Sequence, residues 1–89
     1  AYVTIFSAET QAESLRLAAE LRAAKIETET WLGAPGALGK QFKQAASRGV
    51  PFALVLGPDE VTAGTVVVKD LRTGTQRPVL RGEVAGALA

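Results

Sequence analysis

The sequence contains no cysteine and no histidine. The absence of cysteine excludes disulfides, thiolate nucleophiles and zinc–cysteine sites. The absence of histidine excludes the Ser–His and Cys–His nucleophile pairs and removes the most common transition-metal ligand. We therefore expect no autonomous catalysis, no metal site and no cofactor in this chain.

Long hydrophobic runs are also lacking. The longest apolar stretch, residues 50–56, is short and contains Pro51, so no membrane span is predicted. No leader with a charged start and an apolar centre is visible. Because the first residue is Ala1, we expect either that an initiator methionine was removed or that the chain is a piece of a longer protein.

The composition indicates one ordinary globular domain over residues 1–89. Hydrophobic residues make up 47% of the chain and charged residues 21%, as in typical folded proteins. The net charge of +1 is too small to indicate a nucleic-acid partner by itself. Residues 1–32 hold three basic and five acidic side chains, whereas residues 33–89 hold seven and four. Any polyanion should therefore meet the second part of the chain, although chance alone can produce so small an asymmetry.

Residue patterns predict alternating strands and helices. Apolar and β-branched runs predict strands over residues 2–6, 27–31, 52–56, 65–71 and 76–80, the second at an edge and the last two as a hairpin. Helices are predicted from a Thr10–Glu13 capping box to Lys25, from Leu38 to Gly49 with Leu38, Phe42, Ala45 and Ala46 as the buried stripe, and from Gly82 onward.

The order βαβαβ, then a hairpin and a helix, predicts an α/β fold. Right-handed crossovers place the first three strands parallel to one another. The predicted architecture is a single small domain with a mixed five-stranded sheet, in two or three layers.

The loop at residues 33–39 resembles a phosphate loop but does not match one. Ala34 stands where the motif needs its first glycine, and Gln41 follows Lys40 where a Mg²⁺-binding hydroxyl is needed. The main interpretation is a turn that leads into a helix. Backbone amides at that helix start, beside Lys40, remain candidates for contact with an RNA phosphate.

Four charged side chains are candidates for RNA contacts, and each has a simpler interpretation. Lys40 and Lys43 share one helix side, which suits phosphate contacts or merely a solvated face. Glu60 follows the buried strand at 52–56, where it can accept from a base or simply stabilise a turn. Lys69 lies in an apolar strand, as an RNA ligand or as a guard against edge-to-edge pairing. Trp31 suits base stacking or packing.

Three stretches together resemble a known family. They are Leu38-Gly39-Lys40-Gln41-Phe42-Lys43-Gln44-Ala45, then Leu56-Gly57-Pro58-Asp59-Glu60, then residues 64–76 with the pattern GxVxVKDLxTGxQ. In order and spacing these are similar to the C-terminal anticodon-binding domain of class II aminoacyl-tRNA synthetases, most of all the histidyl-tRNA synthetase branch. The resemblance covers essentially the whole chain.

The resemblance implies a binding function. It implies that Glu60 and Lys69 contact anticodon bases and that Lys40, Gln41 and Lys43 approach the backbone of the anticodon loop, here of histidine tRNA. It further implies a longer cytoplasmic, homodimeric synthetase whose other parts bind ATP and Mg²⁺ and join histidine to tRNA. The sequence departs from the family at Gly39, where many members carry a second basic residue.

Two other functions stay open. A synthetase-like paralogue can keep this fold for protein interaction or regulation without binding tRNA. An unrelated α/β domain can bind a nucleotide or phosphate through residues 33–39, although the mismatched phosphate-loop spacing weighs against it.

Overall fold

The computed structural model describes residues 1–88 and contains five strands and four α-helices within them. Their bounds are β1 Tyr2–Val3, α1 Gln11–Ala23, β2 Glu29–Thr30, α2 Leu38–Ser47, β3 Phe52–Val55, α3 Pro58–Ala63, β4 Thr65–Asp70, β5 Gln76–Leu80, a 3₁₀ turn at Arg81–Glu83, and α4 Val84–Leu88. The predicted elements are therefore present, and Pro58–Ala63 forms an additional helix, α3, between the third and fourth strands.

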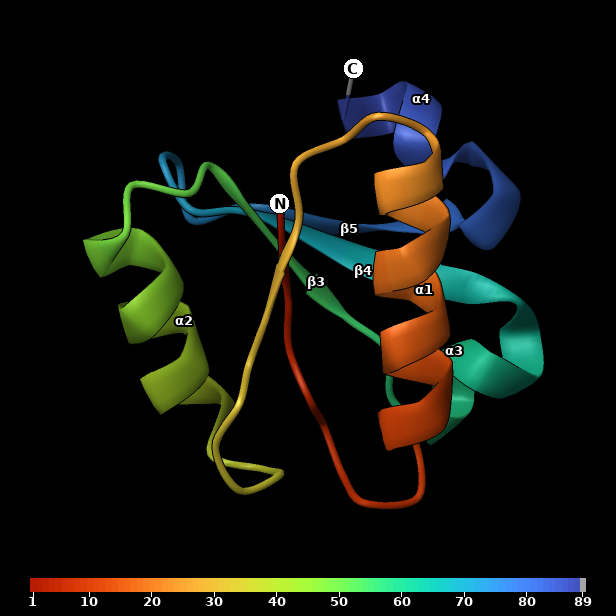
Figure 1. Cartoon of the computed structure of the whole chain (residues 1–89), viewed down its shortest axis with the longest axis horizontal. Helices are drawn as coiled ribbons and strands as arrows, with labels where there is room; N and C mark the ends of the chain where they lie inside the picture. The colour runs from red at the N-terminus through yellow and green to blue at the C-terminus, as the bar shows by residue number, and fades with distance from the viewer. Residues whose placement is uncertain (89) are drawn as a thin grey trace.

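The strands form one mixed sheet in the order β2-β1-β3-β4-β5 (Figure 1). β1 pairs in parallel with β2 and β3, while β4 pairs antiparallel with β3 and β5. This confirms the predicted mixed five-stranded sheet and the edge position of the second strand. Lys69 is not on an edge strand, because β4 lies between β3 and β5. A role for Lys69 as an edge guard is thereby excluded.

Helices cover both faces of the sheet. Val68 packs in the core cluster with Leu17 of α1 and Val84 of α4, whereas the neighbouring Lys69 lies over the ring of Phe42 in α2. Successive strand residues point to opposite faces. The fold thus has three layers, with α1 and α4 on one face and α2 on the other. Within residues 1–88, no helix is long and apolar enough to cross a membrane.

The start of α1 differs from the predicted capping box. The Thr10 side chain makes no capping hydrogen bond and instead donates to the Ser7 carbonyl. Glu13 turns away to ion pairs with Arg81 and Arg16. A charge-assisted bond to a guanidinium is stronger than a bond to a backbone amide, which accounts for the difference.

The buried side of α2 also differs from the predicted stripe. Gln41 and Ala45 are the buried residues, Leu38 and Phe42 are half-buried, and Ala46 is exposed. The helix turns a different side to the sheet than the predicted stripe, because Gln41 bonds the backbone N–H and C=O of Ile5, two residues after β1. A hydrophobicity pattern cannot reveal this, since it assigns a glutamine to the solvent side.

Candidate nucleic-acid interface

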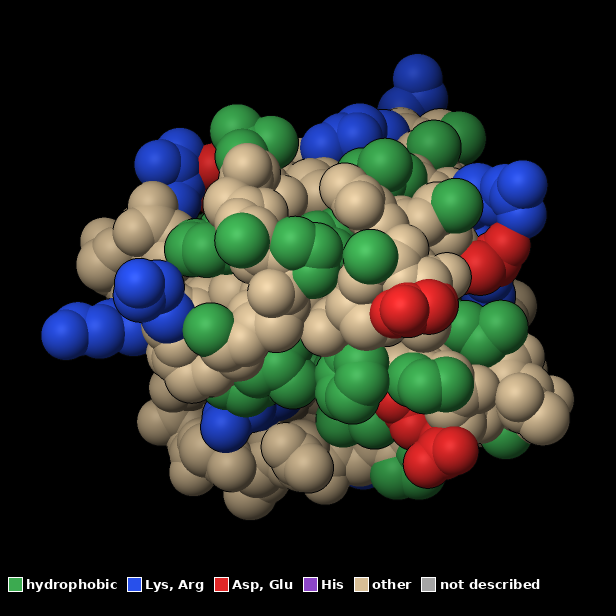
Figure 2. All heavy atoms as spheres, turned by 90° about the horizontal axis from the view of Figure 1, so that it is seen from below, with side chains coloured by type: hydrophobic (Ala, Val, Ile, Leu, Met, Phe, Trp, Pro, Cys, Tyr) green, Lys and Arg blue, Asp and Glu red, His purple; other side chains and the backbone are tan. Residues whose placement is uncertain are grey.

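The parallel strands end at one edge of the sheet, where three segments meet. We call this edge the loop end; it comprises residues 6–10, residues 31–37 and residues 57–60. Figure 2 views the molecule from this side and shows apolar side chains across the middle, cationic ones on the left and along the upper and right-hand edges, and acidic ones mainly on the right. The carboxyl ends of parallel strands are the usual ligand sites of α/β sheets.

Lys40, Lys43 and Lys69 form what we call the lysine surface. Lys40 and Lys43 are exposed on α2, and Lys69 is half-buried on β4, with Nζ 4.4 Å from the centre of the Phe42 ring. This cation–π contact links β4 to α2. Within residues 1–88, none of these lysines takes part in an ion pair. Their charges are therefore available to a polyanion.

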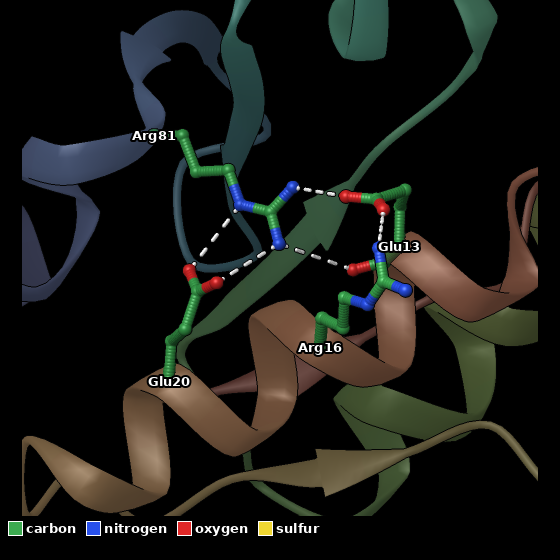
Figure 3. A network of polar contacts seen from close by, with 4 residues as sticks. All are labelled: Glu13, Arg16, Glu20 and Arg81. Carbon is green, nitrogen blue, oxygen red and sulfur yellow. Dashed lines mark hydrogen bonds and ion pairs between the residues drawn. The ribbon is translucent and has the colours of Figure 1, made fainter.

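Arginine behaves differently on the opposite face. Arg81 donates to both Glu13 (Nη1 to Oε2, 2.6 Å) and Glu20 (Nη2 to Oε2, 3.0 Å), and Arg16 pairs with Glu13 (Figure 3). We call these four residues the clamp, because they tie the 3₁₀ turn before α4 to α1. The hydrogen bond from Arg81 is the main reason that the pKa of Glu13 lies below its ordinary value. Charges in the clamp neutralise one another.

Glu60 lies in the first turn of α3 and is half-buried. Its Oε1 accepts a hydrogen bond from the Gly57 amide at 2.9 Å. Within residues 1–88, Oε2 has no hydrogen-bond partner. One oxygen therefore holds the side chain in place while the other stays available as an acceptor.

Glu60 and Lys69 occupy separate points of the molecule. Lys69 pairs across the sheet with Ala53, and Gly57 follows Ala53 by four residues. At about 3.3 Å per extended residue, Lys69 is separated by about 13 Å along the sheet from Gly57, whose amide Glu60 contacts. The two side chains thus offer two contact points for a ligand longer than one nucleotide.

Gln41 does not lie on the surface that the sequence predicts for it. Its side chain is fully buried, with Oε1 accepting from the Ile5 amide at 2.7 Å and Nε2 donating to the carbonyls of Ile5 (2.9 Å) and Gly36 (2.6 Å). The amide thus pairs with the end of β1 as another strand would. All of its polar atoms are used, so Gln41 is a positioning residue for α2 and makes no contact with RNA in this conformation.

Trp31 likewise has a structural role, in the loop before α2. Its indole Nε1 donates to the Ala34 carbonyl at 2.9 Å, and its ring lies so close to Gly33 that a Cβ there would approach the ring to 2.6 Å. The Gly36 amide in turn donates to the Ile5 carbonyl. These contacts support the packing interpretation of Trp31, and they fix the loop that precedes Lys40.

Phe6 is a candidate that sequence reasoning missed. It follows β1, and 39% of it is exposed although the preceding Ile5 is buried. The sequence pattern places Phe6 inside a strand, and only the position of that strand's end shows that the ring emerges at the loop end.

Within residues 1–88, no cluster of three or more acidic side chains is placed to hold a metal ion.

Comparisons with known proteins bear on this interface. A family model described as an anticodon binding domain matches residues 1–89. The chain belongs to the anticodon-binding domain family. It is 45% identical over 74 residues to the histidine–tRNA ligase of Paracoccus denitrificans, covering 83% of this chain and 15% of the relative. It is 39% identical over 88 residues to that of Stenotrophomonas maltophilia, covering 99% of this chain and 19% of the relative. The chain thus spans less than a fifth of the length of either curated relative.

Two solved structures of aminoacyl-tRNA synthetases contain the same fold. The domain matches a histidyl-tRNA synthetase from Nostoc sp. PCC 7120 with a TM-score of 0.92 and 30% identity, over 98% of this chain and 21% of that one. It matches the RNA binding domain of threonyl-tRNA synthetase from Cryptosporidium parvum with a TM-score of 0.87 over 97% of this chain and 22% of that one. At 16% identity, the second match bears on the fold alone. The resemblance inferred from the three sequence stretches is confirmed.

Proposed function

We propose that this anticodon-binding domain recognises the anticodon loop of histidine tRNA on behalf of a longer histidine–tRNA ligase. The observation that carries the proposal is the family match over residues 1–89, together with relatives that are named histidine–tRNA ligases. The unpaired lysine surface supports it, because phosphate contacts need cations that no carboxylate neutralises.

In the proposed mechanism the domain binds and does no chemistry. Lys40 and Lys43 contact phosphates of the anticodon loop and hold its register. Anticodon bases unstack and lie against the loop end, as single-stranded RNA does on many protein surfaces. Lys69 donates to a base or phosphate, and Glu60 accepts from the amino group of a base. Gln41 acts only through α2, which it fixes to β1.

The longer protein supplies the remaining functions in this proposal. Its other parts bind ATP and Mg²⁺ and join histidine to the tRNA, and it works as a cytoplasmic homodimer. The relatives support this division, since the aligned residues make up only 15% and 19% of their lengths. Binding of the anticodon loop here adds to the grip that the rest of the synthetase has on the acceptor end.

Exchange of Glu60 for glutamine tests the proposed recognition. Glu60→Gln keeps the shape and the bond to Gly57 but removes the anionic acceptor, so affinity for the cognate stem-loop should fall about tenfold, and much less for a stem-loop with a different anticodon. Fluorescence anisotropy with labelled stem-loops measures both. Glu83→Gln, the same exchange at an exposed glutamate outside the loop end, is the matched control and should change neither.

Equal losses with both stem-loops would show that Glu60 does not read a base. Absence of binding by the unchanged domain, at millimolar RNA and low salt, would contradict anticodon recognition as a whole. That second result would favour the protein-interaction alternative.

A further inference from the structure

Phe6 is a large aromatic side chain that stands out from the sheet at the loop end. It is 39% exposed, whereas Ile5 before it is 1% exposed. A single exposed apolar side chain needs no functional explanation in itself. The position of Phe6 beside Gly57 and Glu60, however, indicates a function for this side chain.

Gly57 brings the ring of Phe6 and the carboxylate of Glu60 to one point. A Cβ placed on Gly57 would lie 2.9 Å from Glu60 Oε1 and 3.4 Å from Cδ2 and Cε2 of Phe6. The φ angle of Gly57 is −90°, a conformation open to any residue. A side chain at position 57 would therefore displace the Glu60 carboxylate, and the glycine leaves the space in which the aromatic ring and the carboxylate lie beside each other.

We propose that Phe6, Gly57 and Glu60 form a site for one unpaired nucleobase that carries an exocyclic amino group. The base stacks on the exposed part of the Phe6 ring, and its amino group donates to Glu60 Oε2. This inference rests on the proposed function and adds to it a stacking residue and a spacing residue, neither of which the sequence motifs assign.

The chemistry of the two side chains defines the preferred ligand. Stacking on an aromatic ring accepts every base, because every base has a π face. An anionic acceptor beside the ring favours adenine, cytosine and guanine, which carry amino groups, over uracil, which does not. The Gly57 amide keeps Glu60 Oε1 occupied, which orients Oε2 for this bond.

Substitution of Phe6 tests the stacking contact. Phe6→Ala should lower the affinity for the histidine anticodon stem-loop about tenfold or more, because loss of a base–aromatic stack has an effect of this size. Phe6→Tyr keeps the ring and should stay within about twofold of the unchanged domain. Leu80→Ala is the matched control, since Leu80 is 55% exposed and lies on β5, outside the loop end and the lysine surface. Amide spectra and urea denaturation of each variant establish that it is folded.

Substitution in the RNA tests the amino group. A stem-loop with inosine in place of its anticodon guanosines lacks only their 2-amino groups. It should bind the unchanged domain several-fold more weakly, and Glu60→Gln should abolish that difference. Gly57→Ala should weaken binding as Glu60→Gln does, because the new methyl group displaces the Glu60 carboxylate.

The outcomes separate this inference from the proposed function. If the unchanged domain binds the stem-loop but Phe6→Ala binds equally well, the nucleobase site is refuted while anticodon recognition stands. If Phe6→Tyr loses as much affinity as Phe6→Ala, stacking on the ring is refuted. If the unchanged domain binds no RNA, both proposals fail.

Discussion

The clamp and the lysine surface both contain cationic side chains and use them in opposite ways. In the clamp, Arg81 lies between two carboxylates of α1. On the lysine surface, Lys40, Lys43 and Lys69 have no carboxylate partner within residues 1–88. All five ion pairs of the described chain use arginine, whose planar guanidinium suits carboxylates. Paired charge links separate elements of the fold, and unpaired charge remains available to a ligand.

The test with the largest expected effect loosens α2, which carries Lys40 and Lys43, from the sheet. Gln41→Leu fills the same buried space but leaves the Ile5 amide and the Gly36 carbonyl without the Gln41 partner. Loss of partners for buried backbone groups should lower the free energy of unfolding by about 3 kcal/mol. Urea denaturation measures this change.

Gln44→Leu is the control for that experiment, because Gln44 is exposed on the same helix. It should leave the stability nearly unchanged. If Gln41→Leu is as stable as the unchanged domain, the buried amide does not fix α2.

A second test removes the clamp. Arg81→Met keeps much of the apolar stem but loses both ion pairs, so stability at neutral pH should fall by at most about 1 kcal/mol, as for partly exposed pairs. RNA affinity should not change, because the clamp lies on the face opposite α2. A large loss of RNA affinity in a fully folded Arg81→Met domain would contradict the separation of the two regions.

The clamp also predicts a pH dependence. Because Arg81 lowers the pKa of Glu13 in the folded domain, its contribution is fully present above the ordinary value of 4.5 and is lost as the pH falls through the lower folded value. The stability difference between the unchanged domain and Arg81→Met should therefore shrink at acid pH. Urea denaturation at pH 7 and at pH 3 measures this stability difference at each pH. Equal differences would show that Glu13 does not contribute to stability through Arg81.

The smallest expected effect concerns one lysine. Lys40→Ala should weaken binding of cognate and mismatched stem-loops alike and reduce the slope of log affinity against log salt by about 0.7, the value for one single-strand phosphate contact. Arg16→Ala, which removes an exposed cation already paired with Glu13, should leave the slope unchanged. An identical slope for Lys40→Ala would exclude Lys40 from the phosphate contacts.

The sequence predicts the mixed sheet well because local residue patterns identify its strands and the crossover connections place the first three parallel to one another. Residues 76–80 form a strand with the predicted bounds, and β2 lies at the edge as its alternation indicates. The short β1 is harder to predict, because the backbone of Ile5 turns from the sheet to the side chain of Gln41. No local pattern reveals that long-range contact.

In the candidate site, too, local features can be predicted from the sequence and long-range contacts cannot. Exposed Lys40 and Lys43 are predictable, since helical spacing alone places them on one side of α2. The buried role of Gln41 and the emergence of Phe6 beside Gly57 depend on packing between distant segments. Glu13 is a further case, because its partner Arg81 is 68 residues away in the chain. Sequence reasoning finds the surface charges and misses the side chains that position them.

The most direct test of anticodon recognition is a residue-resolved titration. Backbone amide shifts would be followed at low salt while a histidine anticodon stem-loop is added, with a mismatched anticodon as the control. Shifts confined to the loop end and the lysine surface, and larger for the cognate loop, are the predicted result. Equal shifts with both stem-loops, or shifts centred on the clamp, would contradict the account.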